Sequence, residues 1–282
     1  MARPPQEAAE WRESFRREED ALLEKGVFTV VDSLPPGVRC LGAKLVFRTK
    51  TDGDGRVLSE NARKTRLTAM GNEQRAGVDY GETFSSAMSL TSLRVLVCLA
   101  AHFGLRIGHI DVSTAYLNAQ LDREIYMRAP PGMHSAKPGQ FLKLARALYG
   151  LHQSGRLWAE LLIKTLCALG FAPCEHGDPY VLVRSSRSTR MLYIGVYVDD
   201  MPILAHPEDQ AEMAEIVQQL RSHFKITVAP EVHTLLGMYG GVPHAPASLR
   251  GESAGADRHG ALQPCPCAGG PQRCRRQLQV RG

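Results

Sequence analysis

The chain has 282 residues and a formal net charge of +5, and 44% of its side chains are hydrophobic and 22% charged. This composition is ordinary for a globular protein and long enough to bury a sizeable core in one or two domains. It excludes a membrane-spanning protein, because no apolar run approaches the roughly 18–20 residues that a span needs. The seven cysteines are an odd number and four of them are scattered through the chain, which argues against a disulfide framework.

The net charge is concentrated at the C-terminal end. Residues 242–282 contain six Arg against one Glu and one Asp, which is +4 of the total. Nucleic-acid binding must therefore depend on local basic patches in the remaining chain. The best of these lies within residues 39–66 and consists of Arg39, Lys44, Arg48, Lys50, Arg56, Arg63, Lys64 and Arg66. Such a run is also typical of a solvated hairpin face.

The N-terminal third is predicted to contain a helix and a hairpin. Residues 1–26 form an amphipathic helix region, with Trp11 and Phe15 at helical spacing over residues 7–25 and Gly26 as its stop. The charged beginning of the chain shows no secretory signal, so we expect an intracellular protein, cytoplasmic or nuclear and not secreted. Residues 27–75 alternate apolar and polar side chains around a turn at 52–55, which predicts two paired strands.

The central part mixes helices and strands. We expect helices at 90–103, 157–169 and 207–224, and strands near Asp111, at 180–184 and on both sides of Asp199. The order strand, helix, hairpin, helix predicts an α+β fold with the helices on one sheet face.

The acidic pair Asp199–Asp200 interrupts an apolar run rich in Val, Ile and Tyr, which predicts the tip of a β-hairpin. Carboxylates are costly to bury unless they are paired or hold a metal. A solvated turn with nothing bound is the alternative. Asp111 follows a second strand-like stretch, so the three carboxylates are candidates to hold two Mg²⁺ ions roughly 4 Å apart.

Several sequence blocks resemble, in order, the reverse transcriptase of copia-type LTR retrotransposons. The resemblance covers residues 10–240 approximately. Its blocks are Trp11 with the helix around it, 42–50, 64–71, 77–85, 111–117, 122–127, 130–132, 148–158 and 197–200. A lone acidic pair would be weak support, whereas this many blocks in one order exclude a chance match.

The resemblance implies a polymerase right hand with palm and fingers and an incomplete thumb. It implies an RNA-directed DNA polymerase of a retrotransposon that extends a primer on an RNA or DNA template with deoxynucleoside triphosphates. Two Mg²⁺ ions would serve as cofactors, with Mn²⁺ as a substitute. Other segments of a retrotransposon polyprotein would be partners.

The resemblance also assigns site residues. It implies that Asp111, Asp199 and Asp200 are catalytic, and that these three together with Val112 hold the metal. Nucleotide-binding residues follow in the same way, with Lys64 and Arg66 on the triphosphate, Tyr116 as a gate against a ribose 2′-hydroxyl, and Gln153 lining the nucleotide pocket. A core aromatic is the alternative for Tyr116. Met70 stands where the family usually has a basic residue.

The expected domain boundaries follow from these blocks. Residues 27–241 form fingers and palm with the start of a thumb. Residues 242–282 are rich in Gly, Pro and Arg and have no periodic apolar pattern, which predicts a disordered tail. We expect a frameshift or exon error near residue 241. In the segment 242–282, Cys265 and Cys267 do not have the usual spacing of zinc ligands.

Two other functions remain open from the sequence. A catalytically decayed retrotransposon remnant would bind nucleic acid weakly or not at all. A different palm-fold phosphotransferase, such as a nucleotide cyclase, would share the carboxylates, but it would give no reason for the blocks at 42–71 and 148–158.

Overall fold

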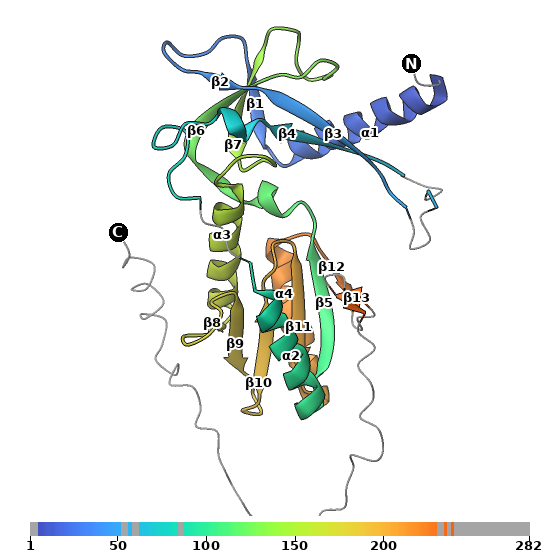
Figure 1. Ribbon diagram of the computed structural model, residues 1–282, viewed down its shortest axis with the longest axis vertical. Helices are drawn as coiled ribbons and strands as arrows, with labels where there is room; N and C mark the ends of the chain where they lie inside the picture. The colour runs from blue at the N-terminus through green and yellow to red at the C-terminus, as the bar shows by residue number, and fades with distance from the viewer. Residues whose placement is uncertain are drawn as a thin grey trace, which may run out of the picture. The chain divides into compact units, whose positions relative to one another are not determined.

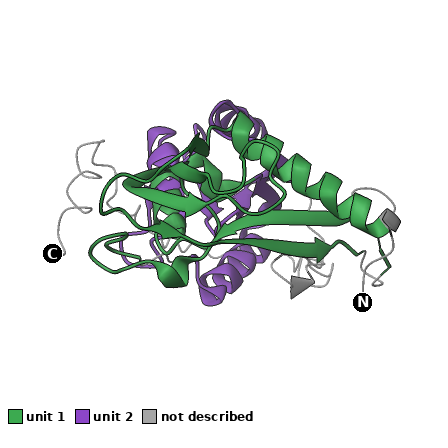
Figure 2. Cartoon of the chain, turned by 90° about the horizontal axis from the view of Figure 1, so that it is seen from above, with its two compact units in different colours: residues 1–86, 114–161 green, residues 87–113, 162–282 purple. Residues whose placement is uncertain are grey.

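The structure is a computed structural model that describes residues 5–51, 56–57, 62–83, 87–229, 234–235 and 238–239. The expected turn at 52–55 and the tail at 242–282 lie outside the described residues. The chain divides into two compact units, each built from two stretches of sequence (Figure 2). Unit 1 comprises Met1–Ser86 and Thr114–Leu161, and unit 2 comprises Ala87–Ser113 and Leu162–Gly282. These boundaries differ from the sequence-based ones, because strands distant in sequence pair within each unit.

Unit 1 contains a four-stranded sheet in the order β1-β7-β6-β2 and the separate hairpin β3-β4 (Figure 1). Its strands are β1 (Phe28–Val31), β2 (Cys40–Leu41), β3 (Ala43–Thr49), β4 (Arg63–Ala69), β6 (Gln120–Arg128) and β7 (Phe141–Arg146). Its helices are α1 (Pro5–Glu24) and the 3₁₀ turns η1 (Gly71–Glu73) and η2 (Ala115–Asn118). The predicted N-terminal helix and the pairing of the strands around residue 52 are confirmed.

Helix α1 packs against β4 and belongs to unit 1. Ser14 accepts a hydrogen bond from the Thr65 amide at 2.8 Å, and Glu18 accepts one from the Leu67 amide at 3.2 Å. Burial raises the pKa of Glu18, against the lowering effects of the Leu67 amide and of neighbouring Arg66 and Lys64. The helix therefore covers one face of the β3-β4 hairpin, and Lys64 and Arg66 of β4 lie on the other face.

Unit 2 contains a six-stranded sheet in the order β12-β5-β11-β10-β9-β8, and β13 pairs with β14. The strands are β5 (Arg106–Val112), β8 (Ala172–Pro173), β9 (Val181–Ser185), β10 (Met191–Gly195), β11 (Asp200–Ala205), β12 (Ile226–Ala229), β13 (Thr234–Leu235) and β14 (Met238–Tyr239). The helices are α2 (Leu90–Phe103), the 3₁₀ turn η3 (Pro207–Asp209) and α4 (Gln210–His223), while α3 (Ser154–Ala168) runs from unit 1 into unit 2. The predicted α+β class and the predicted helices are confirmed.

Helices α2 and α4 lie on opposite faces of the unit 2 sheet, and not on one face as the order of the elements predicted (Figure 1). Leu93 and Leu96 of α2 pack with Leu204 of β11. Helix α2 begins at the N-cap Ser89, whose hydroxyl accepts from the Ser92 amide at 3.0 Å, and ends at Gly104 with φ +64°. Apolar burial on both faces thus holds the central strands β5 and β11 in a fixed register.

Candidate active site

The strands β5 and β11 bring Asp111 and Asp200 directly opposite each other. They pair antiparallel, with Asp200 facing Asp111 in the ladder. The Val112 amide donates to the Asp199 carbonyl at 2.8 Å, which identifies the two aspartates as a non-hydrogen-bonded pair. Side chains of such a pair lie on one sheet face with Cα atoms about 4.5 Å apart. Two like charges in this arrangement repel, and a cation between them would relieve the repulsion.

Asp199 lies in the two-residue loop of the acidic hairpin. The Tyr197 amide donates to the Asp200 carbonyl at 2.9 Å, and the Asp200 amide donates back at 3.0 Å. Val198 has φ +58°, a left-handed conformation that suits a tight hairpin but is unusual for a β-branched residue. Backbone strain of this kind clusters at functional sites. The turn leaves Asp199 exposed next to the Asp111–Asp200 pair.

His109 supports the pair from β5. Its Nε2 atom lies 2.8 Å from Oδ1 of Asp200, and both side chains are partly buried. The imidazole N–H donates to the carboxylate, which holds one oxygen and orients the other. Sequence reasoning missed His109. Alternation along β5 would have placed it on the same face as Asp111, two residues earlier.

The carboxylates fit a hard cation whose ligands come partly from the protein and partly from a bound substrate. Among the residues that the structure describes, no group of three or more His, Cys, Asp or Glu side chains is arranged to hold a metal ion. Mg²⁺ usually takes one or two carboxylates, several waters and substrate phosphates, and it does not need an all-protein cage. Asp111 and Asp200 meet that smaller requirement. Val112 has a buried apolar side chain, so its carbonyl is the one group it has for a metal.

The expected nucleotide-binding residues all lie in unit 1, whereas the carboxylates lie in unit 2. Lys64 and Arg66 alternate along β4 and share one hairpin face with Lys44 and Arg48 of β3. This face is the one that α1 leaves uncovered. Tyr116 is half-buried on η2, and its ring packs edge-on against Tyr149, with centroids 5.4 Å apart.

Gln153, expected to line the nucleotide pocket, lies just before α3. Its side chain is fully buried. Its Oε1 accepts from Gln74 at 3.0 Å, and its Nε2 donates to the Asp79 carbonyl at 3.1 Å. These two hydrogen bonds tie the 74–79 segment to the residue that precedes α3.

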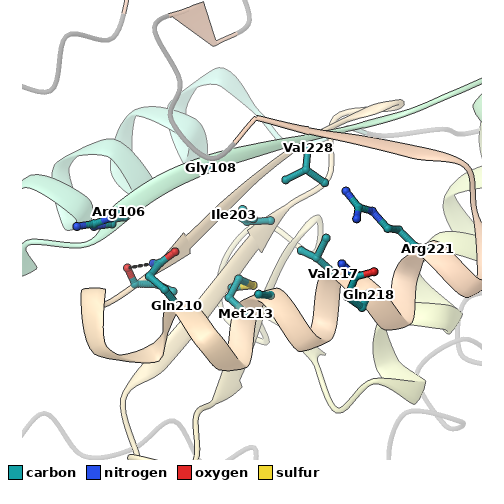
Figure 3. A pocket seen from close by; sticks show the side chains of 11 residues that line it. Arg106, Gly108, Ile203, Gln210, Met213, Val217, Gln218, Arg221 and Val228 are labelled. Atoms are coloured by element: carbon teal, nitrogen blue, oxygen red, sulfur yellow. Dashed lines mark hydrogen bonds between the residues drawn. The ribbon is translucent and has the colours of Figure 1, made fainter.

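A separate pocket of about 230 Å³ lies between α4 and the sheet of unit 2 (Figure 3). Gly108 and Ile203 form its floor, and Met213 and Val217 of α4 face them. Because side chains alternate along a strand, this is the sheet face opposite to Asp111 and Asp200. The pocket is therefore not part of the carboxylate site.

Comparison with known proteins decides the family. Residues 25–240 match the family described as reverse transcriptase (RNA-dependent DNA polymerase). The chain belongs to this reverse transcriptase family. It is 32% identical over 229 residues to the Retrovirus-related Pol polyprotein from transposon RE2 of Arabidopsis thaliana, which covers 81% of this chain and 15% of the relative. It is also 32% identical over 226 residues to the Retrovirus-related Pol polyprotein from transposon TNT 1-94 of Nicotiana tabacum. That match covers 80% of this chain and 16% of the relative.

This reverse transcriptase chain thus spans about 15% of the length of the curated relatives that it matches. Among solved structures, it is similar to a foamy viral protease-reverse transcriptase in complex with double-stranded DNA. That match has a TM-score of 0.44 and 14% identity and covers 81% of this chain and 33% of the other. In the part of the chain that the structure describes, no helix is both long and apolar enough to cross a membrane.

Proposed function

We propose that this chain is the RNA-directed DNA polymerase of a retrotransposon, and that Asp111, Asp199 and Asp200 carry its chemistry. The observation that carries the proposal is the pairing of Asp111 with Asp200 across two neighbouring strands, in a chain that belongs to the reverse transcriptase family. Family membership supports the reaction class. The pairing supports these carboxylates as its centre.

The carboxylates have separate tasks in this proposal. Two bound Mg²⁺ ions would polarise the primer 3′-oxygen and the triphosphate and neutralise charge on the leaving group. Asp111 and Asp200 would share the ions from one sheet face, and Asp199 would approach from the exposed turn. His109 holds Asp200 in orientation through its hydrogen bond. The Val112 carbonyl would complete the set.

The nucleotide would be bound by the residues of unit 1. Lys64 and Arg66 supply fixed cations on one hairpin face, which suits a triphosphate. Tyr116 would pack under the sugar and exclude a 2′-hydroxyl. The primed RNA or DNA template would be the macromolecular partner, and other segments of a polyprotein would accompany the chain in the cell.

Primer extension on an RNA template tests the proposal. The wild-type chain is assayed with Mg²⁺ and with Mn²⁺, beside Asp199→Asn and Asp111→Asn. A matched control is Asp20→Asn, since this aspartate lies on α1 with a 59% exposed side chain. We expect the wild type and the control to extend the primer and both site variants to lose extension by at least about 100-fold.

The alternative is a decayed remnant. It is favoured if a folded wild-type preparation extends no primer with either metal. Extension that survives both Asp111→Asn and Asp199→Asn would instead remove these carboxylates from the mechanism.

A further inference from the structure

The ring of Tyr149 lies between two residues of the proposed nucleotide site. The Arg66 guanidinium carbon is 5.3 Å from the centroid of the Tyr149 ring. The Tyr116 ring meets the same ring edge-on, with centroids 5.4 Å apart and planes inclined by 63°. The three side chains come from β4, from the turn before α3 and from η2, all within unit 1. Tyr149 therefore contacts both Arg66, the candidate phosphate-binding residue, and Tyr116, the candidate sugar gate.

Two features hold the backbone at Tyr149 against β4. The Ala69 amide donates to the Tyr149 carbonyl at 2.8 Å. Gly150 has φ +91°, and a Cβ atom there would lie 2.2 Å from the Ala69 carbonyl oxygen. Glycine is thus required for the turn to approach the strand this closely. The fixed backbone sets the point from which the Tyr149 ring extends.

The position of the Arg66 guanidinium over the Tyr149 ring is a cation–π contact, which uses none of the N–H donors of Arg66. A guanidinium is planar, and its N–H groups point outward in that plane, whereas its face packs on the aromatic ring. The N–H fork is then directed by the ring and available to a triphosphate. The edge-on contact between the two tyrosine rings restricts the rotation of Tyr116. One ring thus sets the spacing between the group that would bind phosphate and the group that would contact the sugar.

We propose that Tyr149 is a positioning residue that determines nucleotide affinity and sugar selectivity by holding Arg66 and Tyr116 at a fixed spacing. This inference rests on the proposed polymerase function. It adds Tyr149, to which the sequence assigned no role, to the proposed nucleotide site.

The test measures binding and turnover separately. Wild type, Tyr149→Phe and Tyr149→Leu are titrated with a fluorescent dNTP and with the matching ribonucleotide, in the presence of Mg²⁺ and a primed template. Single-nucleotide extension then gives the KM and the maximal rate. The control is Tyr126→Leu, because Tyr126 is buried in unit 1 and lies beneath Lys143, whose Nζ is 5.7 Å from its ring centroid. Thermal unfolding accompanies each variant.

Loss of the ring should act on affinity and selectivity. We expect Tyr149→Leu to weaken dNTP binding and raise KM by about three- to tenfold, with a smaller change in the maximal rate. The preference for dNTP over the ribonucleotide should fall by a similar factor. Tyr149→Phe keeps both ring faces and should stay within about twofold of wild type. Tyr126→Leu should lower the melting temperature and leave affinity and preference unchanged.

Wild-type affinity and preference in Tyr149→Leu would overturn the inference and leave the polymerase function intact. A wild type that binds dNTP through Tyr149 but extends no primer would overturn the function and support the inference. Absence of both binding and extension would overturn both. Should Tyr149→Leu not fold, Tyr149→Met carries the same expectations, because its unbranched, flexible side chain adapts to an irregular space and lacks an aromatic face.

Discussion

His109 and Asp200 are joined across β5 and β11 by a 2.8 Å hydrogen bond from the imidazole Nε2 to the carboxylate Oδ1. The bond occupies one oxygen of a carboxylate whose strand partner is Asp111. It fixes the direction in which the second oxygen points. Groups that orient a metal ligand in this way contribute to metal affinity as well as to rate.

Replacing His109 should therefore weaken the metal site. We expect His109→Ala to raise the Mg²⁺ concentration needed for half-maximal primer extension, or to lower the rate, by about 10- to 100-fold. Extension rates over a Mg²⁺ titration measure this, and the Mg²⁺-induced shift of the melting temperature gives a readout without turnover. His102→Ala is the control, because His102 is an exposed histidine near the end of α2. An unchanged Mg²⁺ titration would show that the hydrogen bond does not act on the metal.

The Asp111–Asp200 pair should lower stability when no metal is bound. Because the two carboxylates face each other directly, Asp111→Asn should raise the free energy of unfolding in EDTA by about 0.2–1 kcal/mol. The same variant should lose the stabilisation that Mg²⁺ gives the wild type. Urea unfolding with EDTA and with Mg²⁺ measures both, with exposed Glu175→Gln as the control. Lower stability of Asp111→Asn in EDTA would contradict the proposed repulsion.

Two glycines with similar φ angles allow the cost of a left-handed backbone to be measured apart from the cost of a steric clash. Gly77 has φ +79° and nothing within 4 Å of an added Cβ, whereas at Gly150 the added Cβ would lie 2.2 Å from the Ala69 carbonyl oxygen. Gly77→Ala should cost about 1–2 kcal/mol for the left-handed conformation. Gly150→Ala should cost about 3 kcal/mol or more, because the backbone must also move. Equal costs in urea unfolding would mean that the turn at Gly150 adapts freely.

Asp209 should make unit 2 sensitive to acid. A hydrogen bond from Arg190 and another from Ser188 lower the pKa of Asp209 to about 2. The unfolded value is about 3.9. Because the folded-state pKa is the lower one, the contribution of Asp209 to stability is complete above about pH 4 and is lost as pH falls toward 2.

Asp209→Asn should therefore be less stable than wild type at pH 7, and the difference should shrink between pH 4 and pH 2. Urea midpoints at pH 7, 4, 3 and 2.5 measure the slope, again beside Glu175→Gln. A difference between wild type and Asp209→Asn that stays constant over this range would remove Asp209 from the acid response.

Much of the local structure could be predicted because it depends on neighbouring residues. Apolar spacing and a terminal glycine predicted α1, and an apolar run predicted α2. Alternation predicted the pairing of β3 with β4. The ordered blocks identified the reverse transcriptase family, since each block is a short stretch whose residue types are visible without a fold.

The sequence by itself determined the family, the main helices, the hairpin β3-β4 and the three acidic candidates. The tertiary structure decided that Asp111 faces Asp200, that Gln153 is buried and that Tyr149 touches both Arg66 and Tyr116. Each of these depends on segments that are far apart in the chain. Asp111 and Asp200 lie on the paired strands β5 and β11, and Tyr149, in the turn before α3, contacts Arg66 on β4. Local periodicity reports which face a residue occupies, but the partner on that face depends on strand register and packing, which arise when the whole core forms.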